Sequence, residues 1–363
     1  MASAATQSSC RVRDLYPSID WGSEVIVLGI ESTSHTFGVG IASSKPPYIL
    51  AEAKHTYIPE KGGIHPREAA QHHVQVAPRI LMEALSEAGL SIRDVDAVAV
   101  ALGPGLGPCL RVGATVARAL AAYYHKPLVP VNHALAHIEI GRLYTCLDDP
   151  VVLYVSGGNT LVAAYAKGRY RVFGETLDIA LGNLLDAFAR DAPLPGDLAP
   201  PPYVKRGMHV VDLCAERGSE PVDLPLGVVK GQDVTFSGLY TAAVRAARRL
   251  RDRVGDVCLA FREIAYSAVV EVTERCLVHT RKKQVLLVGG VAASPVLREK
   301  LASMTEYHGA SWGAPPPRLA GDNGAMIAWL GLLNYMAGLT CSIEDAVVKQ
   351  RWRLDDTPAP WRA

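Results

Sequence analysis

The feature that most constrains the fold of this chain is a strand–turn–strand pattern that occurs twice. EVIVLGI, ESTSHT and FGVGIAS (24–43) form the first copy, and VVLYV, SGGNT and LVAAYA (151–166) form the second. Apolar, β-branched runs on either side of a turn rich in glycine and hydroxyl side chains predict β-hairpins. Each hairpin is followed downstream by a buried strand that ends in glycines, DAVAVALGPGLG (96–107) and QVLLVGGVAAS (284–294). The repetition predicts two similar halves.

Segments with helical periodicity lie between these strands, at 67–89 in the first half and 260–282 in the second. Alternating strands and helices predict an α/β fold in which helices cover mixed sheets. Two facing hairpin loops would form anion nests for a nucleotide phosphate tail in a cleft between two lobes.

Size supports two lobes, because a chain of 363 residues with 49% hydrophobic residues exceeds the usual single core. We expect the following organisation along the chain: an irregular arm (1–23), an N-terminal α/β lobe (24–130), a C-terminal α/β lobe (131–340) with a Pro-rich insertion at about 192–206, and a tail (341–363) that packs back on the body.

Composition excludes several classes of protein. The net charge of +1 is far from that of a protein that grips nucleic acid by itself. Seven cysteines without CxxC spacing, an odd number, exclude a fully paired set of intramolecular disulfides and favour a reducing cytoplasm. The longest apolar stretch, Ala325 to Leu339, is interrupted by Asn334 and is too short to span a bilayer. A soluble cytoplasmic protein without membrane contact is therefore expected.

Two segments allow both a binding and a structural interpretation. An arginine stripe could contact RNA or could be a solvated helix face; its members are Arg245, Arg248, Arg249, Arg251 and Arg253. GPGLGPCLRVGATVARAL (103–120) could cradle a phosphate at a helix N-terminus, but close packing on a sheet is favoured.

HALAHIE places His133 and His137 one helical turn apart, so both imidazoles project from the same face and can bind one metal ion. Two packed or surface histidines are the structural alternative. Zinc peptidases carry a glutamate directly after the first histidine, whereas this chain has Ala134. GDNGAMIAW (321–329) offers Asp322 as an oxygen ligand, although an aspartate before an apolar helix can also be its cap.

The turn YVSGGNT has two glycines that let its backbone approach a ligand, with Ser156, Asn159 and Thr160 able to hydrogen-bond phosphate oxygens. A plain hairpin turn is the alternative. Further along, Asp178 and Asp186 lie among apolar residues, where a carboxylate suits ribose hydroxyls or a structural role.

Nine segments in this order resemble the universal threonylcarbamoyl transferase family (TsaD/OSGEP), and the resemblance extends from Ile26 to Arg353: GIESTSHTFGVGI, GIHPREAAQHH, GPGLGPCLRVGATVARAL, NHALAHIE, YVSGGNT, GETLDIALGNLLDAFAR, TFSGL, GGVAAS and GDNGAMIAW. HTFGVGI and VKQRWRLDD are similar to the archaeal and eukaryotic branch, which serves as the catalytic subunit of the KEOPS complex. The resemblance implies the two-lobed α/β fold of actin, sugar kinases and heat-shock chaperones (ASKHA), with duplicated RNase H-like units.

The resemblance also implies the site residues. It implies one divalent metal ion, iron or zinc, with the ligands His133, His137, Asp322 and Tyr154. The first three would be catalytic. It implies that a nucleotide of the ATP/AMP type contacts Tyr154, Val155, Ser156, Gly157, Gly158, Asp186, Gly207, Asp212 and Ser294. Ser294 stands where the family usually has asparagine and lacks the bidentate reach of an amide.

The implied activity is transfer of a threonylcarbamoyl group from threonylcarbamoyl-AMP to N6 of the adenosine 3′ of the anticodon in tRNAs that read ANN codons. The implied partners are tRNA and the KEOPS subunits: a small atypical kinase/ATPase and small accessory and dimerisation proteins. Two other functions stay open at this point. One is a metalloprotease, against which Ala134 counts. The other is a nucleotide-gated module or kinase of the same fold.

Overall fold

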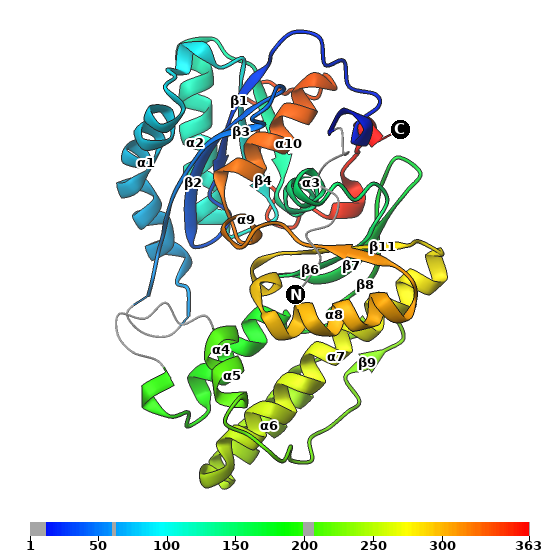
Figure 1. Ribbon diagram of the computed structural model, residues 1–363. Coiled ribbons are helices and arrows are strands. Elements are labelled where there is room, and N and C mark those ends of the chain that lie inside the picture. The colour runs from blue at the N-terminus through cyan, green and yellow to red at the C-terminus, as the bar shows by residue number, and fades with distance from the viewer. Residues whose placement is uncertain (1–11, 60–62, 199–206, 363) are drawn as a thin grey trace. The chain divides into compact units, whose positions relative to one another are not determined.

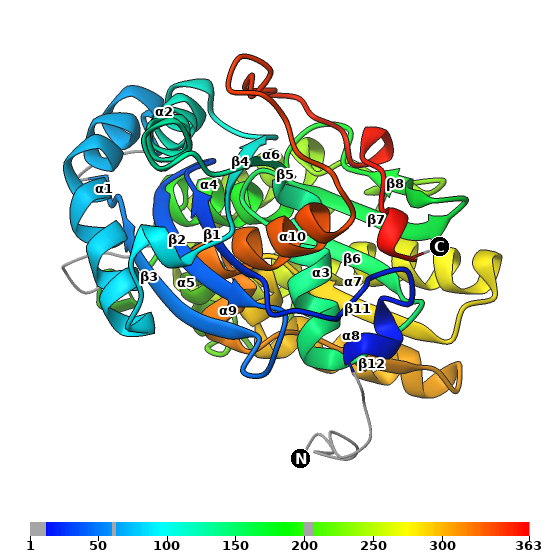
Figure 2. The ribbon, with the colours of Figure 1, turned by 90° about the horizontal axis from the view of Figure 1, so that it is seen from above.

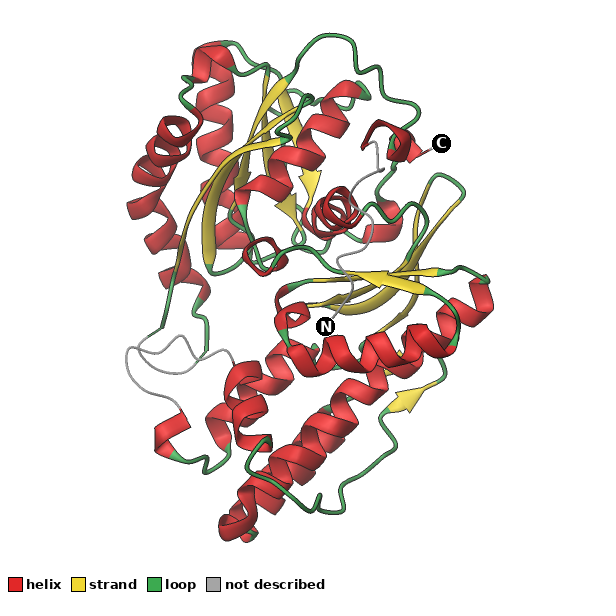
Figure 3. Cartoon of the chain, in the orientation of Figure 1, coloured by secondary structure: helices red, strands yellow, loops and turns green. Residues whose placement is uncertain are grey.

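A computed structural model describes residues 12–59, 63–198 and 207–362 (Figure 1). The contacts between residues divide the chain into two compact units. The first comprises the chain up to Asp148, the short segment Ala166–Tyr170 and the chain from Asp322 onward. The second comprises Asp149–Tyr165 and Arg171–Gly321. Both contain strands and helices, as Figure 3 shows by colour.

The first unit is built on a five-stranded sheet with the order β3-β2-β1-β4-β5. Strand β1 pairs antiparallel with β2 and parallel with β4. The strands are β1 (Ile26–Glu31), β2 (Thr36–Ser43), β3 (Ile49–Thr56), β4 (Ala97–Gly103) and β5 (Leu128–Asn132). The helices are α1 (Pro66–Ala88), α2 (Gly107–Tyr124), α3 (His133–Thr145) and α10 (Gly324–Met336). Helices α1 and α2 cover one face of the sheet, and α10 and α3 lie on the other (Figure 2).

Helix α10 lies directly on the backbone of this sheet. A Cβ atom added at Gly29 of β1 would lie 2.1 Å from the backbone nitrogen of Ala328. One added at Gly40 of β2 would lie 2.3 Å from that of Ala325. Only glycine allows such an approach, because any side chain would overlap the helix. The glycines of the first predicted hairpin therefore fix how α10 is seated.

The second unit repeats the topology of the first, with the strand order β12-β11-β6-β7-β8. Strand β6 pairs antiparallel with β7 and parallel with β11. The strands are β6 (Val151–Val155), β7 (Thr160–Ala166), β8 (Arg169–Glu175), β11 (Gln284–Val288) and β12 (Ser311–Gly313), with a separate pair β9 (Val229–Lys230) and β10 (Asp233–Val234). Its helices are α4 (Leu181–Asp191), α5 (Gly207–Ala215), α6 (Ser237–Arg249), α7 (Val254–Thr280), α8 (Pro295–Tyr307) and α9 (Pro317–Ala320). The predicted duplication is confirmed.

Short 3₁₀ helices complete the described residues: η1 (Val12–Leu15), η2 (Ile92–Asp94), η3 (Gly196–Leu198), η4 (Arg251–Arg253), η5 (Gly290–Ala293), η6 (Leu354–Asp356) and η7 (Pro360–Arg362). Helix η3 falls in the predicted Pro-rich insertion, of which 199–206 lie outside the described residues. The start of the predicted N-terminal arm, 1–11, also lies outside them.

The units are divided at other positions than those expected from the sequence. The sequence places 131–340 in the second lobe, whereas α3 and the chain from Asp322 onward belong to the first unit. The physical reason is packing, since α10 contacts β1, β2 and β4, and α3 contacts α10. The tail follows the same unit, with the Cys341 amide donating to the Leu128 carbonyl at 2.9 Å.

The structure bears on two expectations from the composition, the absence of a membrane span and reduced cysteines. No helix within the described ranges is long and apolar enough to cross a bilayer. Cysteines 109, 214, 258, 276 and 341 are free thiols. Cys146, however, is disulfide-bonded, so the cysteines are not uniformly reduced as the sequence led us to expect.

A fully buried ion pair anchors α3 in the first unit. Arg142 Nη1 donates to Glu139 Oε2 at 2.8 Å, and both side chains are completely buried. The Tyr170 hydroxyl donates to the other Glu139 oxygen at 3.1 Å, and Arg142 also donates to the Leu15 and Leu147 carbonyls. Every charged atom of the pair therefore has a partner, which is what makes buried charges tolerable.

We expect Glu139→Gln to lower stability by about 3–5 kcal/mol, because it leaves the Arg142 charge buried without its counter-charge. Glu83→Gln is the matched control, since the Arg79–Glu83 pair has the same length of 2.8 Å but is about half exposed. The control should cost less than about 1 kcal/mol. Differential scanning calorimetry measures both, and equal shifts in melting temperature would contradict the assigned role of burial.

Candidate functional site

Helix α3 presents two histidines from inside the first unit. Asn132 caps the helix, its side chain accepting a hydrogen bond from the Leu135 amide at 3.1 Å. His133 and His137 follow on one face, with ring centroids 4.7 Å apart and ring planes at 87°. Both side chains are buried. The predicted helical pair is therefore an interior pair and not a surface one.

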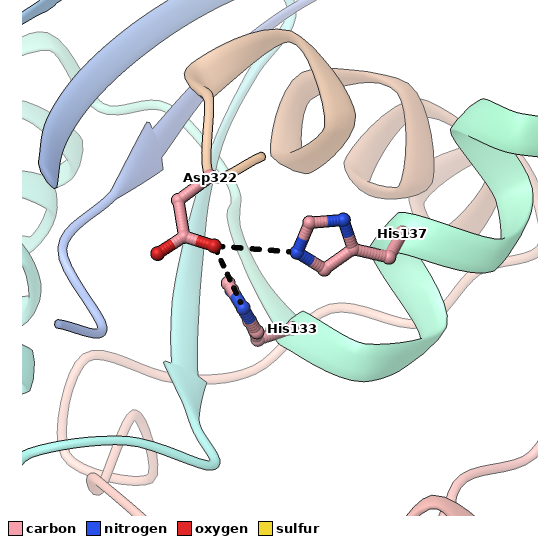
Figure 4. Close-up of side chains that lie close together, drawn as sticks. All are labelled: His133, His137 and Asp322. Carbon is pink, nitrogen blue, oxygen red and sulfur yellow. Dashed lines mark hydrogen bonds and ion pairs between the residues drawn. The ribbon is translucent and has the colours of Figure 1, made fainter. Parts of the chain in front are cut away.

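Asp322 faces these histidines from the start of α10. Its Oδ1 atom lies 3.5 Å from His133 Nε2 and 3.3 Å from His137 Nε2 (Figure 4). The helix cap is the next residue, Asn323, whose side chain accepts from the Met326 amide at 2.9 Å. The capping interpretation of Asp322 is therefore wrong, and its carboxylate is left to point toward α3.

The chemistry of these three side chains suits a divalent metal ion. One ligand atom from each lies within 4.8 Å of the others, and no other group of three such residues occurs in the part of the chain that the structure describes. Burial lowers the pKa of His137. Burial by itself would raise the pKa of Asp322, but hydrogen bonds and charge from the two histidines hold it well below its ordinary value.

Two imidazoles and a carboxylate are ligands that zinc and ferrous iron accept. Here the two Nε2 atoms face the same Asp322 oxygen, so one ion could be held by all three side chains. The residues present therefore fit the implied ion. Tyr154, the fourth predicted ligand, is fully buried in β6 of the second unit, and its role at the ion stays a prediction.

Sequence reasoning missed two residues behind His133. Glu31, the last residue of β1, is fully buried and its Oε2 atom lies 2.9 Å from His133 Nδ1. Thr33 donates to Glu31 Oε1 from its amide and from its hydroxyl, both at 2.6 Å. The signal was present as a glutamate that directly follows the apolar run IVLGI. The Thr33 amide points to Glu31, so it is not part of the anion nest expected of this turn.

In the second unit, the predicted nucleotide-binding turn lies at the end of β6. The Ser156 amide donates to the Asn159 carbonyl at 2.8 Å, which closes the turn. Gly157 and Gly158 are exposed. Helix α4 begins against the turn, since the Gly182 amide donates to the Ser156 carbonyl at 3.0 Å. A helix N-terminus beside an exposed glycine turn is a favourable place for an anion.

Other predicted nucleotide contacts of the second unit form two pairs. Asp186 on α4 accepts a hydrogen bond from the Gly207 amide at 2.6 Å. Asp212 on α5 accepts from the Ser294 hydroxyl at 2.9 Å and from the Tyr266 hydroxyl at 3.1 Å. Burial raises the pKa of Asp212. Ser294 also caps α8, so its hydroxyl is already engaged within the protein.

Asp178 has the structural role left open in the sequence. It accepts hydrogen bonds from the Thr235 hydroxyl at 2.6 Å and from the Phe236 and Ser237 amides at 2.9 and 3.0 Å. Burial works against this, but these bonds outweigh it and lower the pKa of Asp178. The carboxylate thereby holds the start of α6 against the end of β8.

The structure also distinguishes in part between binding and structural roles for the Gly/Pro-rich segment 103–120 and for the arginine stripe at 245–253. A Cβ added at Gly107 would lie 2.4 Å from the Gln350 side chain, so the glycines of 103–120 serve close packing. In the arginine stripe, Arg248 donates to the Asp191 carbonyl at 3.4 Å and Arg253 to Asp256 at 2.7 Å. Arg245 and Arg249 are exposed and form no ion pair with a described residue.

A family model and two archaeal relatives that match this chain all carry the same name. Residues 48–329 match the family model described as "TsaD: tRNA N6-adenosine threonylcarbamoyltransferase". A protein of Hyperthermus butylicus with the name tRNA N6-adenosine threonylcarbamoyltransferase is 68% identical over 352 residues, which cover 96% of this chain and 95% of that protein. A protein of the same name from Aeropyrum pernix is 58% identical over 338 residues, which cover 93% and 95%.

Among solved structures, the "Crystal structure of T.kodakarensis HypF" matches with a TM-score of 0.62 and 14% identity, covering 88% of this chain and 49% of that one. At this identity the likeness shows the fold alone. It confirms the predicted α/β fold of the ASKHA type, which the duplicated sheet order already indicates.

We expect His133→Ala and Asp322→Ala to purify as folded proteins with strongly reduced metal content, because each removes one of three ligands while the two large α/β cores remain. His279→Ala, on the exposed side of α7, is the control and should keep its metal. Elemental analysis and circular dichroism measure content and folding. Unchanged metal in either ligand variant would show that these residues do not hold the ion.

Proposed function

Because this chain belongs to the tRNA N6-adenosine threonylcarbamoyltransferase (TsaD) family, we propose that it transfers the threonylcarbamoyl group from threonylcarbamoyl-AMP to N6 of the adenosine 3′ of the anticodon in tRNAs that read ANN codons. AMP is the second product. The observation that supports this proposal in the structure is the convergence of His133, His137 and Asp322, three side chains that could hold one metal ion, in a member of a tRNA-modifying family.

The reaction is an acyl transfer. The N6 amine attacks the carbamoyl carbon of the mixed anhydride, a C–N bond forms, and the C–O bond to the phosphate breaks. AMP leaves with the electron pair of that bond, and one N6 proton is released. Catalysis of such a step needs positioning of the two substrates and stabilisation of charge on the departing phosphate, without a covalent enzyme intermediate.

In this proposal His133, His137 and Asp322 hold one divalent ion, iron or zinc, which supplies Lewis-acid polarisation of substrate oxygens when bound. Both imidazoles are buried and the Asp322 side chain is only 14% exposed, so the three side chains lie largely away from solvent. A charge held where water is excluded acts more strongly on a nearby substrate than one in solvent.

The second unit supplies the nucleotide-binding residues in the same proposal. The exposed turn at Gly157 and Gly158, together with the N-terminus of α4, binds the phosphate. Asp186 and the Gly207 amide, already hydrogen-bonded to each other, lie on α4 and α5 for the ribose side of the nucleotide. Asp212 and Ser294 form the next polar pair along this unit.

A metalloprotease is disfavoured by the surroundings of the histidines. Ala134 replaces the glutamate that activates water in zinc peptidases. The two nearest glutamates are otherwise engaged, Glu139 with Arg142 and Glu31 with His133 and Thr33. Hydrolysis of casein by metal-loaded protein that His133→Ala abolishes would nevertheless restore that function.

Reconstitution tests the transfer and its partners. We propose that this chain works in the cytoplasm within a KEOPS complex, with a small atypical kinase/ATPase and small accessory and dimerisation subunits. A net charge of +1 leaves much of the grip on tRNA phosphates to those subunits.

The chain should therefore bind adenine nucleotides by itself but modify tRNA slowly, and the partner subunits should restore the rate. The assay contains tRNA, threonine, bicarbonate, ATP and the adenylate-forming enzyme, followed by mass spectrometry of nucleosides. A full rate without the partners contradicts their proposed role. The absence of modified adenosine with all partners present contradicts the transferase.

Gly157→Val should weaken nucleotide binding while leaving metal content unchanged, because a branched side chain blocks approach of the phosphates to the turn. The fold should tolerate it, since an added Cβ at Gly157 would meet only the Asn183 side chain, at an ordinary 3.6 Å. Gly196→Val is the matched control, because an added Cβ there meets nothing. Gly168→Val would not serve, because φ at Gly168 is +82° and any side chain is strained there. Unchanged nucleotide affinity by calorimetry would show that the turn is only a hairpin.

A further inference from the structure

We propose that Glu31 and Thr33 are positioning residues that hold His133 in a single tautomer, with the proton on Nδ1 and the lone pair of Nε2 directed at the metal ion. This inference rests on the metal centre proposed above. It assigns a purpose to the turn of the first hairpin, which joins the end of β1 to the start of β2.

Two hydrogen-bond acceptors face His133 Nδ1, one from Glu31 and one from Thr33. An ionised carboxylate only accepts, so Glu31 Oε2, 2.9 Å from His133 Nδ1, requires a proton on Nδ1. Thr33 Oγ1 lies 3.2 Å from the same Nδ1 atom. Because the Thr33 hydroxyl proton is already donated to Glu31 Oε1 at 2.6 Å, its oxygen can only accept from Nδ1 as well.

When an ion is bound and the imidazole is neutral, a proton on Nδ1 leaves the lone pair on Nε2. His133 Nε2 is the atom that faces Asp322. Carboxylates and other acceptors behind a metal-binding histidine commonly fix its tautomer and orientation in this way. Glu31 and Thr33 are buried, as is His133. Solvent therefore does not compete with these two acceptors for the proton on His133 Nδ1.

The turn that carries these acceptors is itself fixed to the rest of the first unit. The Thr33 carbonyl accepts from the Leu106 amide at 2.7 Å. The Ser34 carbonyl lies 3.1 Å from His73 Nε2, on helix α1. Burial lowers the pKa of His73 to about 4, so this contact persists with a neutral imidazole across the physiological range. The turn is therefore fixed by α1 and by the residue that caps α2, and this holds Glu31 and Thr33 in place beside His133.

Glu31→Gln tests the proton arrangement directly, because an amide has one oxygen where the carboxylate has two. Glu31 Oε1 receives two hydrogen bonds from Thr33, so the amide oxygen of Gln is best placed there. The amide NH₂ group then faces His133 Nδ1 and needs a lone pair on that atom. When zinc occupies Nε2, the proton stays on Nδ1 and faces this amide without the carboxylate acceptor.

The experiment uses full-length protein labelled with ¹⁵N in histidine, compared with zinc bound and after chelation. In the zinc-bound parent, the His133 signal, assigned by its loss in His133→Ala, should be that of the Nδ1–H tautomer, and in Glu31→Gln the Nδ1 proton should lose its acceptor and exchange faster with solvent. Titration with zinc should show affinity lower by about 10–100-fold in Glu31→Gln. Glu24→Gln is the matched control, since Glu24 precedes the same strand and accepts only from Ser43.

Thr33 provides a second route in case Glu31→Gln folds poorly. Thr33→Val removes the hydroxyl and should lower zinc affinity, whereas Thr33→Ser keeps the hydroxyl and should restore it. The outcomes separate the two levels of the proposal. Parental exchange of the Nδ1 proton and parental zinc affinity in both Glu31→Gln and Thr33→Val, with zinc binding lost in His133→Ala, overturn the positioning role. Zinc binding retained in His133→Ala overturns the metal centre itself.

Discussion

Helix α10 meets the backbone of β1 and β2 directly at Gly29 and Gly40, and the position of Asp322 depends on this contact. Glycines 29 and 40 remove the Cβ atoms that would otherwise overlap the helix. A close-packed interior cannot shift by the two or three ångströms that a larger side chain would need at these positions. The helix therefore has a single position, or seat, on the sheet. That seat brings the residue before the helix cap, Asp322, within 3.5 Å of His133. A larger residue at either glycine would displace the ligand as well as the helix.

His133 and His137 lie on α3, and two buried polar groups fix this helix and its first histidine. Glu139 and Arg142 form a fully buried pair that ties the helix to the Leu15 and Leu147 carbonyls. Glu31 contacts His133 itself. The first sets where the helix lies, and the second sets which ring nitrogen is available. Together these contacts fix both the position of α3 and the orientation of the His133 ring.

The two halves share a strand order but use their hairpin turns differently. In the first unit the turn after β1 is directed inward, where Thr33 serves Glu31 and the Ser34 carbonyl contacts His73. In the second unit the turn after β6 keeps Gly157 and Gly158 exposed beside the start of α4. One duplicated element therefore contacts His133 in one copy and exposes its backbone in the other. Sequence repetition predicts the common topology, but the burial of each turn decides its chemistry.

The sequence by itself determined the duplicated α/β plan, the paired histidines of HALAHIE and the absence of a peptidase glutamate, because strand and helix periodicities and residue spacing are local properties. It left Asp322 between ligand and helix cap, and the tertiary structure excluded the cap by giving that role to Asn323. It also placed α3 and α10 with the second lobe and did not single out Glu31. Those points depend on contacts between residues about a hundred or more positions apart, such as Glu31 with His133 and His137 with Asp322. No local pattern records them, because they arise only when α10 and α3 pack on the same face of one sheet.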